Sequence, residues 1–366
     1  MQTVPYVNLA AQWQAERDDL LPIVEAVLAS GQYVGGSIIE EFEHQAAALC
    51  QTKHCVALNS GTDALVCGLL ALGVKPGDEV ITPPNSFIAS TAAIVHLRAK
   101  PVFADVLPDQ NIDPEKIEQA ITSRTKAIMP VHLTGRMARM DQIMEIANRY
   151  GIPVIEDAAQ SIGSKYQDIP SGRWGKVGCF SAHPLKNLNA CGDAGFLVTD
   201  DDAIASQIRS MRNHGIVDRN TVERFGYVSR MDTLQAAILR YRLTELEGVI
   251  EKRRQNASLY RQTIDQTHAF IPEDQPEEFN TYHTFVIQTD QREGLKAYLS
   301  DHGIETAIHY PVPIHLQPAS KDLNYGSGSF PATEDQAAKI LTLPIHQYLQ
   351  AQDVIDIANQ LNRFFL

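Results

Sequence analysis

The sequence predicts an α/β fold in which a mainly parallel, seven-stranded sheet lies between layers of helices, followed by a smaller α+β domain. Between His54 and Thr199, short apolar runs alternate with helix-length segments, a rhythm typical of parallel sheets covered on both faces. After Asp201 the chain becomes mostly helical. A length of 366 residues suits one large and one smaller domain, and we place the large one at 1–240 and the small one at 241–366.

Each predicted element rests on its own local pattern. The first helices are Glu16–Ala29, whose apolar residues share one face, and Ile38–Leu49, and a glycine-rich loop that contains Tyr33 separates them. The predicted strands of the sheet are His54–Leu58, Glu79–Thr82, Pro101–Asp105, Lys126–Val131, Pro153–Glu156, Val177–Ser181 and Phe196–Thr199. The helices between them are Asp63–Leu72, Phe87–Leu97 and Met140–Tyr150. Later elements are helix Ala203–Met211, a long helix from Asp232 to about His268, strand His283–Thr289, helix Gln291–His302, strand Glu305–Tyr310 and helix Asp353–Phe365.

Composition and charge narrow the class of protein. A net charge of −13 argues against binding to nucleic acid or to a membrane surface, so an anionic substrate would need a locally basic site. No apolar run is long enough to cross a membrane. The five cysteines form no CxxC pair and no secretory segment is seen, which predicts reduced thiols and a cytoplasmic location. The twelve histidines form no HExxH motif, so we expect no metal site.

Polar and aromatic side chains follow the first two predicted strands, at the edge of the sheet where ligands bind in parallel α/β folds. Gly61 and Thr62 begin a helix directly after the first strand. Free backbone N–H groups there suit a phosphate, although an ordinary threonine cap is the alternative. Phe87 follows the second strand, and its ring either covers a planar ligand or belongs to the core.

A second group of candidates lies farther along the same edge. Asp157 ends an apolar strand, where a carboxylate needs a protonated ring nitrogen or an arginine as its partner. Ser181 and His183 end the next strand, and Lys186 is the only charge between Lys176 and Asp193. An amine, a buried carboxylate, an aromatic face and a helix start together fit pyridoxal 5′-phosphate.

Several motifs occur in order along the whole chain. They are Asn59-Ser-Gly-Thr-Asp-Ala-Leu65, Pro76-Gly-Asp-Glu-Val-Ile-Thr82, Glu156-Asp-Ala-Ala-Gln160, Pro184-Leu-Lys-Asn-Leu188, Ser229-Arg-Met-Asp-Thr-Leu-Gln-Ala-Ala237 and His309-Tyr-Pro-Val-Pro313. With these motifs the chain resembles the DegT-type (DegT/StrS) nucleotide-sugar aminotransferases, which are fold-type I enzymes dependent on pyridoxal 5′-phosphate. The resemblance implies the same fold and cofactor here.

The resemblance also assigns roles to single residues. It implies that Lys186 forms a Schiff base with the cofactor, that Asp157 pairs with its pyridine nitrogen and that Gln160 approaches its ring hydroxyl. Phe87 would stack on the ring, and Gly61, Thr62 and Ser181 would hold the phosphate. In this family the segment from Gly226 to Arg230 reaches the neighbouring subunit's site, which implies a homodimer with shared active sites. Val228 departs from the family's usual asparagine, and Ala182 and Ala194 from its usual aromatic residue and glycine.

The resemblance implies a reaction in two halves, with glutamate or glutamine as amino donor and a nucleotide-linked keto-sugar as acceptor. Lys186 would move the proton in both halves. The Gly-Asp-Ala-Gly run that ends at Gly195 favours a 3-keto over a 4-keto sugar. The candidate substrate contacts are Tyr33, His183, Arg230, His309 and Tyr310.

Other functions remain open at this stage. A 4-keto aminotransferase and a regulator that binds the cofactor without turnover share most of these residues. A sugar 3-dehydratase is disfavoured, because those relatives replace the lysine with histidine.

Overall fold

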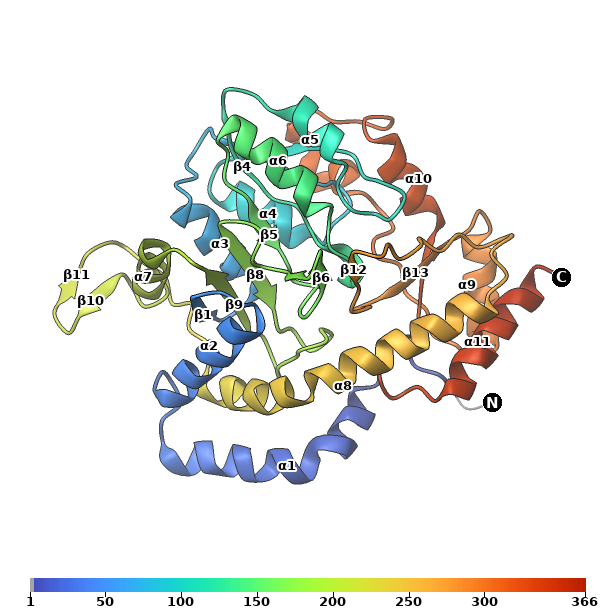
Figure 1. Cartoon of the computed structure of the whole chain (residues 1–366), viewed down its shortest axis with the longest axis horizontal. Helices are drawn as coiled ribbons and strands as arrows, with labels where there is room; N and C mark the ends of the chain where they lie inside the picture. Colours follow the sequence, from blue (N-terminus) through green and yellow to red (C-terminus); the bar gives the residue numbers. More distant parts are fainter. Residues whose placement is uncertain (1–2) are drawn as a thin grey trace.

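A seven-stranded sheet forms the centre of the molecule in a computed structural model that describes residues 3–366 (Figure 1). Its strands are β1 (His54–Leu58), β2 (Glu79–Thr82), β3 (Lys100–Phe103), β4 (Thr125–Ile128), β5 (Ile155–Asp157), β8 (Val177–Ser181) and β9 (Gly195–Thr199). Four of them run in the order β1-β9-β8-β5 and three in the order β3-β2-β4. Parallel bridges from Ile128 to Val154 and from Val131 to Asp157 join the two groups. Only β9 runs antiparallel to its neighbours, which confirms the predicted α/β class.

Helices cover both faces of this sheet. In β1, Val56 and Leu58 face a core shared with α3, α4 and α7, whereas Cys55 and Ala57 face a core shared with α2 and α8. Because successive strand residues point to opposite faces, an apolar strand buried on both sides needs this double covering. The helices of this half are α1 (Leu9–Ser30), α2 (Ser37–Leu49), α3 (Gly61–Ala71), α4 (Ile88–His96), α5 (Pro114–Ala120), α6 (Met140–Tyr150) and α7 (Asp202–Met211).

The C-terminal part has a core of its own. The helix α8 (Thr233–Thr263) runs from the sheet toward α9 (Arg292–Asp301) and α11 (Ala351–Phe364), as Figure 1 shows. Between them β13 (Phe285–Gln288) pairs antiparallel with β14 (Ile340–Leu343), a strand that the sequence patterns did not indicate. Because α8 passes through residue 240 without a break, a domain boundary at that residue stays a prediction.

The predicted strand Glu305–Tyr310 is wrong. Its backbone forms a single bridge, from Ala307 to Thr342, and the rest of the segment crosses toward the sheet of the first half. Pro311 and Pro313 follow directly and have no N–H to donate, so the pairing cannot extend.

The remaining elements are short. They are β6 (Lys165–Tyr166), β7 (Ile169–Pro170), β10 (Ile216–Asp218), β11 (Thr221–Val222), β12 (Glu278–Phe279), α10 (Pro331–Lys339) and the 3-10 turns Leu133–Gly135, Ile314–Leu316 and Pro318–Leu323. Over residues 3–366, none of the helices combines the length and the apolar character needed to cross a membrane.

Candidate active site

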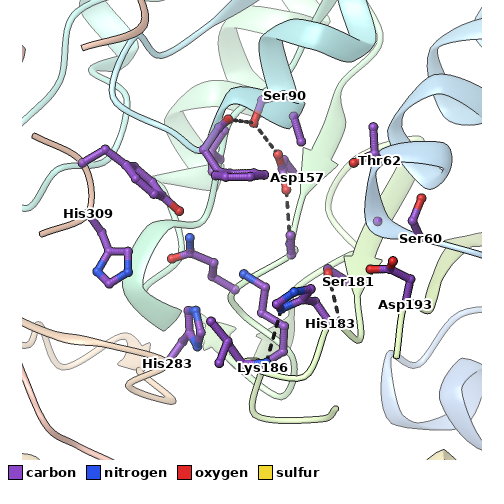
Figure 2. A pocket seen from close by; sticks show the side chains of 18 of the residues that line it. Ser60, Thr62, Ser90, Asp157, Ser181, His183, Lys186, Asp193, His283 and His309 are labelled. Atoms are coloured by element: carbon purple, nitrogen blue, oxygen red, sulfur yellow. Dashed lines mark hydrogen bonds between the residues drawn. The ribbon is translucent and has the colours of Figure 1, made fainter. Parts of the chain in front are cut away.

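A cavity of about 440 Å³ opens at the edge of the sheet where β1, β5 and β8 end (Figure 2). Ten of the twelve predicted site residues line it. They are Gly61, Thr62, Phe87, Asp157, Gln160, Ser181, His183, Lys186, His309 and Tyr310. The other two, Tyr33 and Arg230, lie outside the lining of this protomer's cavity.

One end of the cavity is formed by the start of α3 against the end of β8. Ser60 caps the helix, since its Oγ accepts a hydrogen bond from the Asp63 N–H at 3.1 Å. A Cβ on Gly61 would lie 2.7 Å from the Ser181 Cβ, and one on Gly195 would lie 2.3 Å from the Ser60 carbonyl carbon. The three segments therefore touch only because these residues are glycines. The first N–H groups of α3 have no intrahelical partner, and with the hydroxyls of Thr62 and Ser181 they fit a phosphate group.

Adding a methyl group at Gly195 should disturb this end of the cavity. Gly195→Ala is expected to push the Ser60 turn away from β9 and to lower the free energy of unfolding by about 1–3 kcal/mol. Affinity for a phosphate-bearing cofactor should fall with it, as measured by denaturation and by cofactor titration. Gly248→Ala in α8 is the control, because that Cβ meets nothing within 4 Å. Unchanged cofactor affinity in Gly195→Ala would count against a phosphate site here.

Asp157 is fixed at the end of β5 by both its backbone and its side chain. Its N–H donates to the Pro130 carbonyl at 2.9 Å, and its own carbonyl accepts from the His132 N–H at 3.0 Å. Its carboxylate accepts from the Ser90 hydroxyl at 2.6 Å and from the Ala159 N–H at 3.2 Å. Burial raises its pKa despite these bonds, and no arginine pairs with it among residues 3–366. A protonated ring nitrogen would supply the missing positive charge.

Lys186 lies in a partly exposed loop directly after β8, and its side chain lines the cavity. The loop is held by Asn187, whose side-chain amide donates to the Thr281 carbonyl at 3.0 Å, and by Asn189, which donates to the Pro184 carbonyl at 2.8 Å. Burial lowers the pKa of Lys186 to about 8, and this effect outweighs the attraction of Asp157. Its amine is therefore partly neutral near physiological pH, as a nucleophile must be.

This pKa predicts how cofactor capture depends on pH. Because only the neutral amine attacks an aldehyde, the rate of covalent attachment to cofactor-free protein should rise about tenfold per pH unit below pH 8. Above about pH 8 the rate should level off. Stopped-flow absorbance across pH 6 to 10 measures this profile, with a free alkyl amine as the control that keeps rising. A protein profile that also rises through pH 10 would contradict the assignment.

Side chains from both halves of the chain complete the lining of the cavity. Phe87 is 55% exposed over the cavity and lies 5.8 Å from the ring of Tyr310, so it is not a core residue. Gln160 accepts from the Thr134 N–H at 2.8 Å. Burial lowers the pKa of His309 to about 4, so its imidazole is neutral, and its Nδ1 lies 3.0 Å from the Thr342 hydroxyl.

Several other lining residues were not among the predicted site residues. They are Tyr6, Ser60, Ser90, Asp193, Arg253, His283 and His346. Ser90 was the most accessible to prediction, because it lies one helical turn after Phe87. Tyr6 reaches the cavity because Val4 pairs with Ile304, a contact that no local pattern indicates.

The sequence and fold match known aminotransferases. Residues 14–362 match the DegT/DnrJ/EryC1/StrS aminotransferase family. The chain is 39% identical over 362 residues to the dTDP-3-amino-3,4,6-trideoxy-alpha-D-glucose transaminase of Streptomyces venezuelae, covering 98% of this chain and 96% of that protein. It is 39% identical over 352 residues to the UDP-2-acetamido-2-deoxy-3-oxo-D-glucuronate aminotransferase of Pseudomonas aeruginosa, covering 96% and 97%. It is also 37% identical over 366 residues to a pleiotropic regulatory protein of Geobacillus stearothermophilus, covering 99% and 98%.

Solved structures agree with this family. The crystal structure of S. venezuelae DesV in complex with a ketimine intermediate superposes with a TM-score of 0.97 at 38% identity, covering 100% of this chain and 99% of that chain. The structure of ntda from Bacillus subtilis with bound cofactor PMP gives a TM-score of 0.92 at 34% identity, covering 99% and 86%. The chain therefore belongs to the DegT/DnrJ/EryC1/StrS aminotransferase family, whose cofactor is pyridoxal 5′-phosphate.

Proposed function

We propose that this protein aminates the keto group of a nucleotide-linked 3-keto-sugar, with glutamate or glutamine as the amino donor. The observation that carries this proposal is that three groups line one cavity: an amine of lowered pKa, a buried carboxylate, and the start of a helix whose free N–H groups fit a phosphate. Two of the similar enzymes have names that place the reacting group at position 3 of a nucleotide-linked sugar.

The residues of the cavity divide the work between holding the cofactor and moving protons. When bound, pyridoxal 5′-phosphate supplies an aldehyde that accepts an amino group and a ring that draws electrons from the reacting carbon. Gly61, Thr62 and Ser181 would hold its phosphate and Asp157 its ring-nitrogen proton. Lys186 Nζ then takes the proton from the amino-bearing carbon of the donor.

In the second half-reaction the same amine acts in reverse. Lys186 Nζ returns a proton to the sugar carbon that carried the keto group, so one side chain serves as base and then as acid. Phe87, whose exposed ring lines the cavity, would stack on the cofactor ring, and Gln160 would approach its ring hydroxyl.

A panel of nucleotide-linked keto-sugars tests the choice of substrate. The pyridoxamine phosphate form of the protein is mixed with 3-keto and 4-keto sugars on uridine, thymidine and guanosine diphosphate. Faster regain of pyridoxal absorbance with the 3-keto sugars supports the proposal. A preference for the 4-keto sugars would replace it with the alternative position.

A regulatory role is the second candidate, because one similar protein is named a pleiotropic regulatory protein. A regulator that binds the cofactor would use the same phosphate site and the same lysine, because Lys186 also captures the cofactor aldehyde. The named transaminases among the similar proteins favour catalysis. A regulator would leave the cofactor's absorbance unchanged when glutamate is added.

We also infer a homodimer in which each subunit completes the site of the other. A hairpin of β10 and β11 carries the exposed apolar residues Val217, Val222 and Phe225, and Tyr33 lies exposed in the loop after α1. Large exposed apolar groups mark interaction surfaces. Arg230 follows this hairpin and donates to the Asn213 side chain at 2.9 Å.

A mixing experiment tests whether the sites are shared. Lys186→Ala and Arg230→Ala should each be inactive, because one lacks the amine and the other lacks the arginine contributed to the partner's site. When the two are denatured together and refolded, mixed dimers would contain one intact site and regain about a quarter of the activity, if half of the dimers are mixed. Light scattering gives the dimer mass. No recovery in a mixed dimer would mean that each subunit works alone.

A cytoplasmic location is inferred from the thiols. All five cysteines are free in the described chain, and four of them are buried. Burial raises the pKa of Cys67 to about 12, so this thiol stays protonated and unreactive. Cell fractionation would test the location, and recovery outside the cytoplasm would contradict it.

A further inference from the structure

Arg253 carries a buried positive charge that no carboxylate of the described chain contacts. It lies in α8, lines the same cavity as Lys186 and is only 7% exposed. Its guanidinium donates to the carbonyls of Tyr282 at 3.2 Å and His283 at 3.1 Å and to the side-chain oxygen of Gln347 at 3.3 Å. These three oxygens are neutral, so the charge itself is left unbalanced.

The other buried arginines show how this chain normally treats such a charge. Arg242 bonds the Glu16 carboxylate at 2.6 Å, and Arg136 bonds the Asp274 carboxylate at 2.9 Å. Arg242 and Arg136 lie outside the lining of the large cavity, whereas Arg253 borders it. Because a buried charge is costly unless it is paired, the missing carboxylate at Arg253 points to a ligand that brings one.

The neighbours of Arg253 favour an anion as well. Burial, and then the nearby charges of Lys186 and Arg253, hold the pKa of His283 well below its usual value, so its imidazole is neutral. Its Nδ1 is buried and has no partner in residues 3–366. In a chain of net charge −13, the guanidinium of Arg253 is therefore the fixed positive charge at this wall of the cavity, beside neutral imidazoles.

The phosphate of the cofactor belongs at the other end. Figure 2 shows Ser60 and Thr62 on the side of the cavity opposite His283 and His309, with Lys186 between the two groups. The carboxylates of the lining are Asp157, already bonded to Ser90, and Asp193, which lies on the Ser60 side. The wall that holds Arg253 is therefore free for an anionic part of a substrate.

We propose that Arg253 anchors a substrate carboxylate, in the first place the α-carboxylate that glutamate and glutamine share. An acidic sugar would offer the same chemistry, so a sugar carboxylate is the second possible source. The proposal rests on the proposed function, because it assigns the contact to a substrate of that reaction. Arginine suits the task because its planar group binds a carboxylate through two parallel hydrogen bonds.

Two substitutions separate the charge from the shape of this anchor. Arg253→Lys keeps a charge without the planar fork, and Arg253→Gln removes the charge. We expect the glutamate concentration that half-saturates the first half-reaction to rise about tenfold in Arg253→Lys and about 100-fold in Arg253→Gln. The second half-reaction with a nucleotide-linked keto-sugar that has no carboxylate should be unchanged.

Arg254→Gln is the matched control. Arg254 is the next residue of α8 and also donates to a backbone carbonyl, that of Asn280 at 2.8 Å, but it lies outside the cavity lining. Thermal unfolding and cofactor content are compared for all variants. If Arg253 only supports the fold, its variants should lose stability and slow both half-reactions alike, and that outcome would overturn the proposal.

A change of the amino donor tests the anchor in the unaltered protein as well, so the test does not depend only on variants that fold. The unaltered protein should use glutamate at least about 100-fold better than glutamate α-amide, and Arg253→Gln should reduce that ratio to near one. A loss confined to a sugar that carries a carboxylate would assign the anchor to the sugar instead. The proposal for Arg253 is refuted if the unaltered protein accepts glutamate α-amide as readily as glutamate, and a keto-sugar without a carboxylate as readily as one that carries it. Failure of every donor would refute the proposed function.

Discussion

Lys186→Ala is expected to abolish amination of any keto-sugar while the cofactor still binds without a covalent bond. Lys186 is the one amine in the cavity lining, and burial lowers its pKa to about 8. Removing it takes away the proton carrier of both half-reactions, which is worth about 10²- to 10⁴-fold by itself. Turnover should fall by at least about 10⁴-fold, because covalent capture of the cofactor is lost as well.

Two checks accompany this substitution. Borohydride reduction of the unaltered protein should place the cofactor's mass on the peptide that contains Lys186, as mass spectrometry would show. Lys176→Ala is the control, because Lys176 lies on the surface in an ion pair with Asp201 at 2.7 Å. Substantial activity in Lys186→Ala, or a label on another lysine, would remove the residue from the mechanism.

Asp157→Asn should have the second largest effect. The asparagine keeps the size and the bond to Ser90 but loses the charge that holds a proton on the cofactor's ring nitrogen. Losing a buried charge partner costs about 3–5 kcal/mol, so turnover should fall by roughly 10²- to 10⁴-fold. Steady-state kinetics and cofactor titration measure this loss.

The control for Asp157 is a carboxylate of similar chemistry outside the cavity. Asp141→Asn removes a carboxylate charge at the start of α6 but keeps an oxygen to accept from the Tyr166 hydroxyl, a bond of 3.1 Å. Its activity should match that of the unaltered protein. Equal activity in Asp157→Asn would show that Asp157 is structural and that another group protonates the ring.

The strands of the sheet and α2 were predictable because their signals are local. The first helix was predicted less well, since it begins at Leu9 and not at Glu16, and Leu21 and Leu28 of its expected apolar face are exposed. Strands buried on both faces are apolar at nearly every position, as in β8 and β9, so short runs reveal them without knowledge of their neighbours. The residues at their ends then share one edge by the rules of parallel sheets. Lys186, Asp157 and Gly61 were found in this way, and the structure places all three around one cavity.

The rest of the site depends on contacts between distant parts of the chain. Arg253 stands between Lys252 and Arg254 in a charged helix, and nothing local distinguishes it from the neighbours that stay outside the cavity. Tyr6 reaches the site through pairing about 300 residues away along the chain, as Val4 bridges Ile304. The strand predicted at Glu305–Tyr310 failed because the segment forms a single bridge, at Ala307, before Pro311 stops the pairing, and its last residues His309 and Tyr310 line the cavity.

The central claim is tested most directly by measuring the stoichiometry of amino-group transfer from glutamate. Glutamate added to the protein with bound pyridoxal 5′-phosphate should convert its absorbance to that of the pyridoxamine form and release one 2-oxoglutarate per site. A nucleotide-linked 3-keto-sugar added next should restore the first spectrum and yield one equivalent of amino sugar. If glutamate leaves the spectrum unchanged and no 2-oxoglutarate forms, the protein binds the cofactor without transferring amino groups, and the account is wrong.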